Sequence, residues 1–470
     1  MNPRNRGPGD PGPGDHGPRD ARPGGRPDRR SHGGAQGGRP PVRSREAGPL
    51  PTLPVHAGVA RVVLRPGAAT PVLAGHPWVF SGAIAHLVPA PDTERIEAGQ
   101  ACAVLDPHGR WLGYGYVNPD SQISVRVLEP GADGLAPRQV PALDDLVRAR
   151  LQQATALRAA LGLPGPLTDA YRLVNAEGDG LPGLVVDRFA DGAVVQASTA
   201  GAWRWRTAVA QWLRGPGGCA WVLVRVPHDV HPSEGLAGDT VQADGDVPDS
   251  VRVRHNGLQL LVEPQGGQKT GMYCDQREAH RRVAELVRPG SFVLDAYCHA
   301  GGFGLHAARA GAGRVLGVDA SLRVVELANA HAALNGLDTY RADCEDAVLT
   351  LRHYAESAAD APRPDLIVVD PPKFATRGAV VEDALRKYFH LNATAVRALA
   401  ADGWLVSCSC SGLVAREAFL RMLAQAAREA GRRATIVDVL GPAPDHPVAP
   451  AHAEGNYLKT ALVRVTPKDL

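Results

Sequence analysis

Several classes of protein are excluded by what the chain lacks. Its seven cysteines are an odd number without close spacing, which excludes a small disulfide-held fold and predicts reduced thiols in a cytoplasmic protein. No apolar run approaches the roughly 18 residues that cross a bilayer, so we expect no membrane contact. Lysine is scarce, with five residues against 46 arginines. With 470 residues, 44% of them apolar, the chain is long enough for about two to four globular domains.

The N-terminal segment differs in composition from the rest of the chain. Residues 1–50 contain 12 glycines and 10 prolines and have a net charge of +5, whereas the remaining 420 residues sum to −3. With so few apolar side chains, this segment cannot offset the entropy cost of becoming ordered. It also lacks the apolar stretch of a secretory signal. We predict that residues 1–56 form a disordered tail, either an arm that binds polyanions or a passive low-complexity extension.

Two regions with strand-like and helix-like sequence patterns follow the tail. Short β-rich runs separated by glycine and proline occupy residues 59–64, 78–80, 102–105, 111–117 and 123–128. Their close spacing predicts a small β-barrel over residues 57–134. Helix-like periodicity at 143–161 and 203–213, together with a turn at 178–183 that opens onto a strand, predicts a linking α/β domain over residues 135–263.

Apolar strands and amphipathic helices alternate regularly in residues 264–470. The pattern predicts strands at 291–296, 314–319, 365–370 and 403–408, and helices at 303–310, 321–335, 384–400 and 415–430. Alternation of this kind is typical of a doubly wound, Rossmann-like α/β fold with a parallel sheet. In such a sheet ligands bind beyond the carboxyl ends of the strands, so the residues that follow each strand are the candidates for function.

Acidic residues and glycines follow the first strands. The first strand ends at Asp295 and runs into Gly301-Gly302, where the backbone can approach a ligand and the next helix offers free amides. The spacing differs from the Gly-x-Gly-x-x-Gly dinucleotide fingerprint, which disfavours a nicotinamide dehydrogenase. Asp319 ends the second strand, where a carboxylate can accept both hydroxyls of a ribose, and Asp343 could border an adenine. Each aspartate alone could be a helix cap or turn residue, but together they indicate a nucleoside-containing cofactor.

The later strands end in a carboxylate and a thiol. Asp370 precedes Pro371-Pro372, which would stiffen the strand exit and hold the carboxylate at the edge of the sheet. Cys410, at the end of the neighbouring strand, is a candidate nucleophile. The alternatives are a rigid turn at the prolines and a small buried hydrophobic residue at the cysteine. Cys408 and Cys410 could also ligate a metal, but no further cysteine or histidine stands nearby at ligand spacing, so we predict none.

These motifs together resemble a known enzyme family. The segments that carry the resemblance are 295–304, Asp319, Asp343, 370–374 and 409–412 in the sheet, and 75–82, 267–277, 445–448 and 454–459 outside it. They are similar to the bacterial large-subunit ribosomal RNA cytosine-5 methyltransferases of the RlmI type, which use S-adenosylmethionine. The resemblance extends from about residue 59 to residue 465. It implies an N-terminal PUA domain, which is a small RNA-binding barrel, and a class I methyltransferase domain.

The resemblance also assigns roles to residues. It implies that Cys410 attacks carbon 6 of a cytosine, that Asp370 holds the pyrimidine edge, and that the product is 5-methylcytidine. The residues expected to hold S-adenosylmethionine are Asp295, Tyr297, Gly301, Gly302, Asp319, Asp343, Asp370 and Pro371. Many RNA cytosine-5 methyltransferases have a second cysteine just after the first proline of the motif that begins here at Asp370. This chain has Pro372-Lys373 at that place. We therefore hypothesise that Cys408, two residues before Cys410 on one strand, assists product release.

The expected partner is large-subunit ribosomal RNA, and a homodimer is a further possibility. A target base must be single-stranded or flipped out of a helix, with stacking to hold it. The candidates for RNA contact are Lys269, Arg277, Lys373 and Phe374, with Tyr388 as a second stacking candidate. Two other functions stay open, namely methylation of an exocyclic guanine amine and a non-catalytic role in ribosome assembly.

Overall fold

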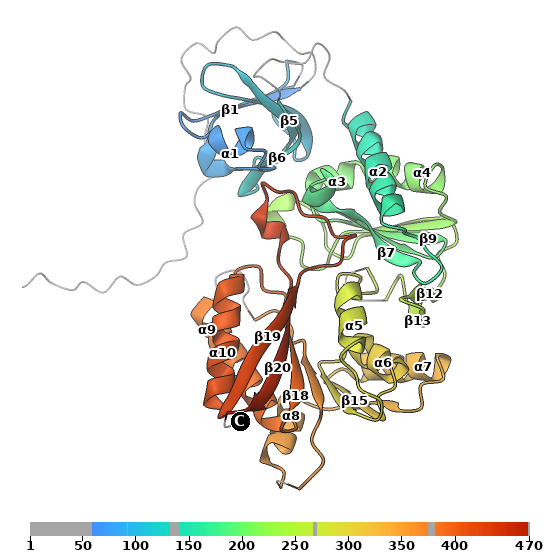
Figure 1. Ribbon diagram of the computed structural model, residues 1–470. Coiled ribbons are helices and arrows are strands. Elements are labelled where there is room, and N and C mark those ends of the chain that lie inside the picture. The colour runs from blue at the N-terminus through green and yellow to red at the C-terminus, as the bar shows by residue number, and fades with distance from the viewer. Residues whose placement is uncertain are drawn as a thin grey trace, which may run out of the picture. The chain divides into compact units, whose positions relative to one another are not determined.

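The computed structural model describes residues 59–91, 93–131, 142–266, 270–358, 360–374 and 381–468. The predictions for the 1–56 tail and for Lys269 therefore fall outside the described residues, as does the predicted boundary between residues 134 and 135. Four β-sheets are formed by the described part of the chain (Figure 1). Short 3-10 helices occur at Ser81–Ala83, Ala176–Asp179, Pro232–Glu234 and Ala453–Gly455.

The first sheet has six strands and its own core. In chain order they are β1 (Ala60–Leu64), β2 (Trp78–Phe80), β3 (Ile84–Val88), β4 (Gln100–Leu105), β5 (Trp111–Val117) and β6 (Ile123–Pro130), with helix α1 (Thr70–Leu73) after β1. They are arranged β2-β6-β5-β4-β1-β3, and only β1 and β4 run parallel. Buried valines and leucines such as Val62, Val104 and Leu112 fill the core. The five short runs predicted from the sequence correspond to β1, β2, β4, β5 and β6, whereas β3 was not predicted.

The second sheet belongs to the linking region. Its strands are β7 (Ala170–Asn175), β8 (Leu184–Phe189), β9 (Gly192–Ala197), β10 (Trp221–Arg225) and β11 (Val241–Asp244), in the order β11-β10-β9-β8-β7. Helices α2 (Leu143–Ala160), α3 (Ala200–Arg204) and α4 (Arg206–Arg214) accompany it. The helix predicted at 203–213 is therefore interrupted at Trp205, whose buried side chain packs edge-on against Tyr116 of β5.

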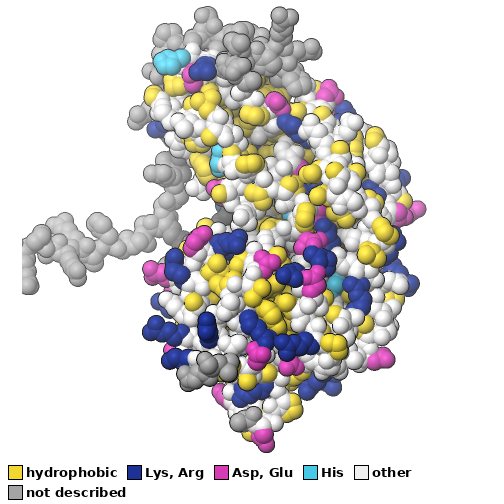
Figure 2. All heavy atoms as spheres, in the orientation of Figure 1, with side chains coloured by type: hydrophobic (Ala, Val, Ile, Leu, Met, Phe, Trp, Pro, Cys, Tyr) yellow, Lys and Arg dark blue, Asp and Glu magenta, His cyan; other side chains and the backbone are white. Residues whose placement is uncertain are grey.

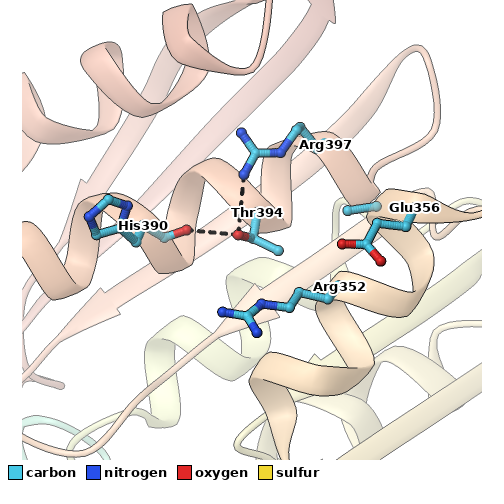
Figure 3. A pocket seen from close by; sticks show the side chains of 6 residues that line it. Arg352, Glu356, His390, Thr394 and Arg397 are labelled. Carbon is cyan, nitrogen blue, oxygen red and sulfur yellow. Dashed lines mark hydrogen bonds between the residues drawn. The ribbon is translucent and has the colours of Figure 1, made fainter. Parts of the chain in front are cut away.

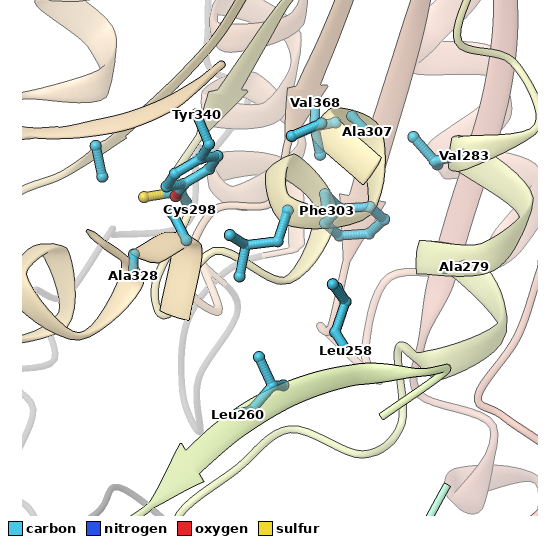
Figure 4. Packing of buried hydrophobic residues seen from close by; sticks show 14 of the residues in the cluster. Leu258, Leu260, Ala279, Val283, Cys298, Phe303, Ala307, Ala328, Tyr340 and Val368 are labelled. Carbon is cyan, nitrogen blue, oxygen red and sulfur yellow. The ribbon is translucent and has the colours of Figure 1, made fainter. Parts of the chain in front are cut away.

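A hairpin of β12 (Val251–His255) and β13 (Leu258–Val262) follows, and the chain then enters the largest sheet. The hairpin turn is Asn256-Gly257. Both residues have positive φ, 50° and 84°, as a two-residue type I′ turn requires. Leu258 and Leu260 point from the hairpin toward Phe303 (Figure 4), so the hairpin closes one end of a core shared with the following helices.

The largest sheet has seven strands. They are β14 (Phe292–Ala296), β15 (Arg314–Asp319), β16 (Tyr340–Cys344), β17 (Leu366–Val369), β18 (Gly403–Ser409), β19 (Arg432–Leu440) and β20 (Lys459–Pro467), arranged β16-β15-β14-β17-β18-β20-β19. The first five in this arrangement are parallel, and β20 is antiparallel to both its neighbours. The predicted doubly wound parallel sheet is confirmed, although the prediction lacked β16 and the β19–β20 pair.

Helices cover both faces of this sheet. One face packs against α5 (Arg277–Ala284), α6 (Gly302–Arg309) and α7 (Leu322–Leu334), and the other against α8 (Ala347–Glu356), α9 (Val381–Ala398) and α10 (Arg416–Glu429). Successive strand residues alternate between the two cores, as Val293 and Leu294 do in β14. The chain starts at β14, builds outward to β16 and returns to β17, so the strand order reverses between β14 and β17. Ligands bind at this kind of reversal in open α/β sheets.

A buried ion network joins the linking sheet to α5 and to the segment before β20, both next to the largest sheet. It consists of Arg158, Asp179, Arg172, Asp187, Arg277 and Asp445, and we refer to it as the Asp445 network. Arg158 pairs with Asp179 at 2.5 Å, Arg172 with Asp187 at 2.6 Å, and Arg277 with Asp445 at 2.8 Å. Asp445 also accepts the backbone N–H of Arg172, and its backbone carbonyl accepts from Arg158.

The network bears on one prediction. Arg277 is 5% exposed, and its guanidinium pairs with Asp445. A phosphate could reach Arg277 only by breaking this buried pair, which would leave the Asp445 carboxylate without that partner. The pair therefore disfavours the predicted RNA contact of Arg277 and joins α5 to the segment before β20.

Candidate active site

The strand ends predicted to carry function lie together at one edge of the largest sheet. Asp295 pairs in register with Val368 of β17, so the ends of β14 and β17 are level. The backbone N–H of Asp370 donates to the carbonyl of Ala296 at 3.3 Å, and the Asp319 carboxylate accepts the N–H of His299, so the three aspartates lie around the end of β14. Their grouping at the reversal of strand order places a strongly negative region where a ligand is expected.

The loop after β14 is held in a strained conformation. Tyr297 and His299 have positive φ values of 64° and 47°, and Gly301 has 88°. Residues other than glycine rarely adopt this left-handed conformation, and backbone strain of this kind is concentrated at ligand-binding sites. The loop leads directly into α6, whose first residue is Gly302. The cofactor contact predicted for Gly301 and Gly302 stays a prediction.

Asp295 is a buried carboxylate with one unpartnered oxygen. It is 1% exposed, its Oδ2 accepts the backbone N–H of Gly304 at 2.8 Å, and its Oδ1 has no partner. Burial raises the pKa of Asp295 to about 7, the charges of Asp370 and Asp319 add to the rise, and the Gly304 hydrogen bond opposes it. A cationic ligand at this edge would stabilise the ionised carboxylate.

Asp319 and Asp343 lie at the ends of β15 and β16. The two oxygens of Asp319 accept backbone N–H groups of His299 at 3.1 Å and Ser321 at 3.0 Å. A carboxylate oxygen has two lone pairs, so each can accept a further hydroxyl. Asp343 is partly exposed and pairs with Arg341 at 2.7 Å. Asp319 ends a strand that the sequence predicted, whereas the strand β16 that contains Asp343 was not predicted.

Asp370 is oriented by a residue that the sequence analysis did not single out. Its Oδ2 accepts from Nε2 of Gln276 at 3.0 Å, and Oε1 of Gln276 accepts from the hydroxyl of Thr460 at 3.2 Å. Gln276 is 6% exposed and belongs to the quoted 267–277 segment. The only sequence signal for Gln276 was its position in that segment. Nothing in the local pattern predicts that it contacts Asp370, which is 94 residues away.

Cys410 is half-buried, directly after the end of β18. Lys459, the first residue of β20, lies beside it. Nζ of Lys459 donates to the carbonyls of Ser411 and Val414, at 2.8 Å each, and the side chain is only 5% exposed. Burial lowers the pKa of Lys459, whereas the negative charge of a Cys410 thiolate opposes this. Among the residues that the structure describes, Lys459 has no carboxylate ion-pair partner.

Cys408 has different surroundings. It is fully buried among core residues such as Val406 and Leu462, and its sulfur accepts a hydrogen bond from Thr460 at 3.5 Å. Burial, followed by the charge of Asp370, raises the pKa of Cys408 well above that of an ordinary thiol. These features favour a packing role over the assistance in product release that the sequence suggested.

The two aromatic candidates for stacking on a base, Tyr388 and Phe374, also differ in burial. Tyr388 is fully buried, and its hydroxyl is 3.2 Å from that of Ser411, which favours a core role over stacking on a base. Phe374 is half-buried, with its ring 4.8 Å from that of Tyr388, and Lys373 beside it is exposed. Pro371, between Asp370 and these residues, is buried. Phe374 and Lys373 therefore stay predicted RNA contacts.

A pocket of about 330 Å³ lies elsewhere, between α8 and α9 (Figure 3). It is lined by Arg352, Ala355, Glu356, His390, Thr394 and Arg397. Arg397 donates to the hydroxyl of Thr394, which donates to the carbonyl of His390. These residues come from the last turns of helices that run back toward the amino ends of the strands. The pocket is therefore remote from the edge that carries Asp370 and Cys410.

Two parts of the chain match described families. Residues 62–130 match a PUA-like domain, and residues 228–464 match an S-adenosylmethionine-dependent methyltransferase. Most of the chain is also similar to proteins named ribosomal RNA large subunit methyltransferase I. The protein of Shewanella denitrificans is 37% identical over 410 residues, 86% of this chain and 99% of the relative. That of Tolumonas auensis is 39% identical over 397 residues, 84% and 96% of the two chains.

Solved structures share the fold. A protein of Streptococcus mutans described as a SAM-dependent methyltransferase has a TM-score of 0.70 and 19% identity, covering 86% of this chain and 99% of its own. A methyltransferase structure complexed with SAH has a TM-score of 0.69 and 20% identity over the same shares. The likeness covers the first sheet, the linking region and the seven-stranded sheet, because it extends over nearly all of the described residues.

Proposed function

The chain belongs to the ribosomal RNA large subunit methyltransferase I family, and we propose on this basis that it methylates carbon 5 of a cytidine in large-subunit ribosomal RNA. The observation that carries the proposal is that a carboxylate, Asp370, and a half-buried thiol, Cys410, follow the ends of the neighbouring parallel strands β17 and β18. No helix among the described residues is both long and apolar enough to cross a bilayer.

The residues at the sheet edge fit S-adenosylmethionine, the cofactor of the family. The sulfonium and ammonium groups of this cofactor are cationic, and the site contains three close carboxylates, one of them with an unpartnered buried oxygen. Asp319 would hold the ribose hydroxyls, Asp343 would border the adenine, and the loop through Tyr297, Gly301 and Gly302 would approach the amino-acid part. When bound, the cofactor supplies an electrophilic methyl group.

Carbon 5 of cytosine is a weak nucleophile, so the enzyme must first activate the ring. In the proposed reaction the Cys410 thiolate forms a bond to carbon 6, and the electrons of the 5,6 double bond move toward carbon 5. Carbon 5 then takes the methyl group, which leaves S-adenosylhomocysteine. A base removes the carbon-5 proton, the double bond forms again, and the Cys410 thiolate leaves. The thiol is thus regenerated, and no metal or redox partner is consumed.

Asp370 and Lys459 support this chemistry from two sides. The Asp370 carboxylate, held by Gln276, can accept from the exocyclic amino group of cytosine, a donor that uracil lacks. Lys459 contributes a buried positive charge next to Cys410 and holds the loop after it through Ser411 and Val414. A cation close to a thiol favours the thiolate, which is the reactive form. Lys459 is therefore proposed as a positioning residue for Cys410.

The RNA contacts are proposed at the exit of β17. Exposed Lys373 can contact a phosphate, and half-buried Phe374 can stack on the flipped base. On the face shown in Figure 2, basic and acidic side chains are interspersed rather than gathered into one basic field. This agrees with a net charge of −3 outside the first 50 residues and makes local contacts more important than general attraction. Whether the chain forms a homodimer stays a prediction, which analytical ultracentrifugation would test.

The decisive experiment uses RNA that contains 5-fluorocytidine. Fluorine cannot leave as the proton does, so the reaction should stop at a covalent adduct between Cys410 and the ring. We expect a protein–RNA band stable in denaturing gels for the wild type and for Cys219→Ala, a matched cysteine in the core of the linking region. Cys410→Ala should give none.

The same experiment separates the other two functions. A guanine amine methyltransferase needs no thiol, so turnover retained in Cys410→Ala would favour that reaction over carbon methylation. A non-catalytic assembly factor would show neither the adduct nor binding of S-adenosylmethionine by calorimetry. Mass mapping of ribosomal RNA from a deletion strain would then identify the base and its position.

A further inference from the structure

Three histidines meet in the interior, away from Asp370 and Cys410. We call them the histidine cluster: His255 at the end of β12, His280 on α5 and His306 on α6. They are 0%, 6% and 1% exposed, and one ring nitrogen of each lies within 4.8 Å of the others. They come from three separate elements, so their meeting is a product of the tertiary fold.

His306 has the arrangement of a metal-binding histidine. Its Nδ1 is 2.7 Å from the carbonyl of Gly302, so Nδ1 carries the proton and donates it. Nε2 is therefore left with a lone pair, and this buried atom has no hydrogen-bond partner. Histidines that bind metals through one nitrogen usually donate the other N–H to a carbonyl or carboxylate in this way.

His255 and His280 have a spacing that suits a shared ligand. Nε2 of His255 lies 3.3 Å from Nδ1 of His280. Two nitrogens bound to one tetrahedral zinc ion, at bond lengths of about 2.0–2.1 Å, lie about 3.3 Å apart. In addition, the buried Nδ1 of His255 has no hydrogen-bond partner. Of these unpartnered nitrogens, Nε2 of His306 is the one that an ion between the three rings would satisfy, because His255 would bind the ion through Nε2.

His331, a fourth buried histidine, shows what a packing role looks like in this protein. It is 1% exposed, its Nδ1 lies 3.0 Å from the carbonyl of Ala300, and its Nε2 accepts the backbone N–H of Leu261 at 2.9 Å. Both nitrogens of His331 are thus satisfied by backbone groups. Buried His446 and His452 also have an Nε2 without a hydrogen-bond partner, so what distinguishes the histidine cluster is that a ring nitrogen from each of three histidines lies within 4.8 Å of the others.

The rings of the cluster are neutral. Burial lowers the pKa of all three histidines, to about 4 for His306, so their lone pairs are available. The charges around His255 are mixed, because Arg277 lowers its pKa and Asp445, the ion-pair partner of Arg277, raises it. A phenyl ring, that of Phe303, packs edge-on against His280 at 4.5 Å.

We propose that the histidine cluster binds one divalent transition-metal ion, of the zinc class, as a structural centre. The ion would join β12 and α5 to the first turn of α6. Gly302 lies directly against the cluster, since a Cβ at this residue would be 2.6 Å from the ring of His280. The centre would thereby fix the glycine turn of the cofactor loop. It takes no part in methyl transfer, so it stands or falls independently of the proposed function.

The test measures metal directly. We expect protein purified without chelators to contain close to one zinc ion per chain by plasma mass spectrometry. Replacement by Co²⁺ should give the visible absorption bands of a four-coordinate site with nitrogen ligands. Adding Zn²⁺ to chelator-treated protein should raise its Tm by several degrees, because an ion that binds only the folded state stabilises it.

Variants assign the metal to the cluster. His306→Gln and His255→Gln should each lower the zinc content at least tenfold, whereas His331→Gln, the buried histidine with both nitrogens satisfied, should retain it. The proposal is overturned if the wild-type protein takes up less than a tenth of an equivalent of Zn²⁺ or Co²⁺ and its Tm does not respond. It is also overturned if metal content is unchanged in both cluster variants. Neither outcome depends on activity toward RNA.

Discussion

The edge of the largest sheet that contains Asp295, Asp370 and Cys410, which we call the catalytic edge, differs from the Asp445 network in how buried charges are stabilised. In the network each carboxylate has an arginine partner, and burial, which would raise the pKa of Asp445, is outweighed by His446 and Arg277, which together hold it well below its usual range. At the catalytic edge Asp295 is as deeply buried but has no cation beside it in the part of the chain that the structure describes, and burial raises its pKa to about 7. Identical side chains thus have opposite pKa shifts because of what lies next to them.

The contrast separates stability from function. Charges paired with arginine hold the linking sheet and the catalytic sheet together, and no ligand can use them without breaking the pairs. Charges left without a cation are costly to the apo protein, but they are available to a cationic cofactor. The first kind of site should therefore respond to mutation mainly in stability, and the second mainly in binding and rate.

The largest expected effect is at the catalytic edge. Cys410→Ala should lower the rate of methyl transfer at least about 10⁴-fold, since loss of a covalent nucleophile leaves only positioning by the site. The free energy of unfolding should change by less than about 1 kcal/mol, because Cys410 is only half-buried. Transfer of a radioactive methyl group to RNA and urea unfolding measure the two quantities. Comparable losses in both would contradict the separation.

The next effect is in the network. Asp445→Asn removes one partner of the buried Arg277 pair and should lower the free energy of unfolding by about 3–5 kcal/mol, because it leaves a buried charge uncompensated. Glu285→Gln, which removes the exposed partner of Arg281 and Arg282, should cost less than about 1 kcal/mol. Urea denaturation compares the two variants. Equal costs would mean that the network is no more important than a surface pair.

The third prediction concerns pH. Because the pKa of Asp295 in the folded protein is about 7, its stabilising contribution is present below the ordinary carboxyl pKa and is lost as pH rises through 7. A cationic cofactor prefers the ionised form, so its affinity should change in the other direction. Calorimetry should show S-adenosylmethionine binding about tenfold weaker at pH 6 than at pH 8, with proton release on binding. Asp295→Asn should bind weakly at both pH values.

The fourth prediction tests Lys459. Lys459→Gln removes the positive charge beside Cys410 and should raise the pH midpoint of Cys410 alkylation by iodoacetamide by about half to one unit. Lys459→Arg should restore part of the shift, because the charge returns in a larger group. Lys468→Gln, which changes an exposed lysine beyond β20, should leave the midpoint unchanged. An unshifted midpoint in Lys459→Gln would limit this residue to holding the loop.

The smallest effect is expected at Cys408. Since its sulfur is buried and hydrogen-bonded by Thr460, Cys408→Ser should alter turnover by less than about threefold. No covalent protein–RNA adduct should accumulate on ordinary RNA in denaturing gels. Accumulation of such an adduct would instead support the hypothesis that Cys408 assists product release, and would place a second functional thiol in the core.

What could be predicted from the sequence was the part with a local pattern. Strand-length apolar runs end at Asp295, Asp319, Asp370 and Cys410, and parallel strands bring their carboxyl ends to one edge, so these residues could be named in advance. The missing strand β16 and the β19–β20 pair had weaker patterns. β19 in particular is largely exposed, which makes its alternation faint.

The tertiary structure alone decided which of the other residues meet. Gln276 reaches Asp370 across 94 residues, Arg277 reaches Asp445 across 168, and the histidine cluster assembles from three elements. Folding also decides how deeply each group is buried. Burial and the neighbouring side chains then determine whether the group has an ion-pair partner, has a raised pKa or lacks a hydrogen-bond partner. A sequence records which side chains are available along the chain, but the distances on which ion pairs and hydrogen bonds depend exist only after packing has brought remote segments together.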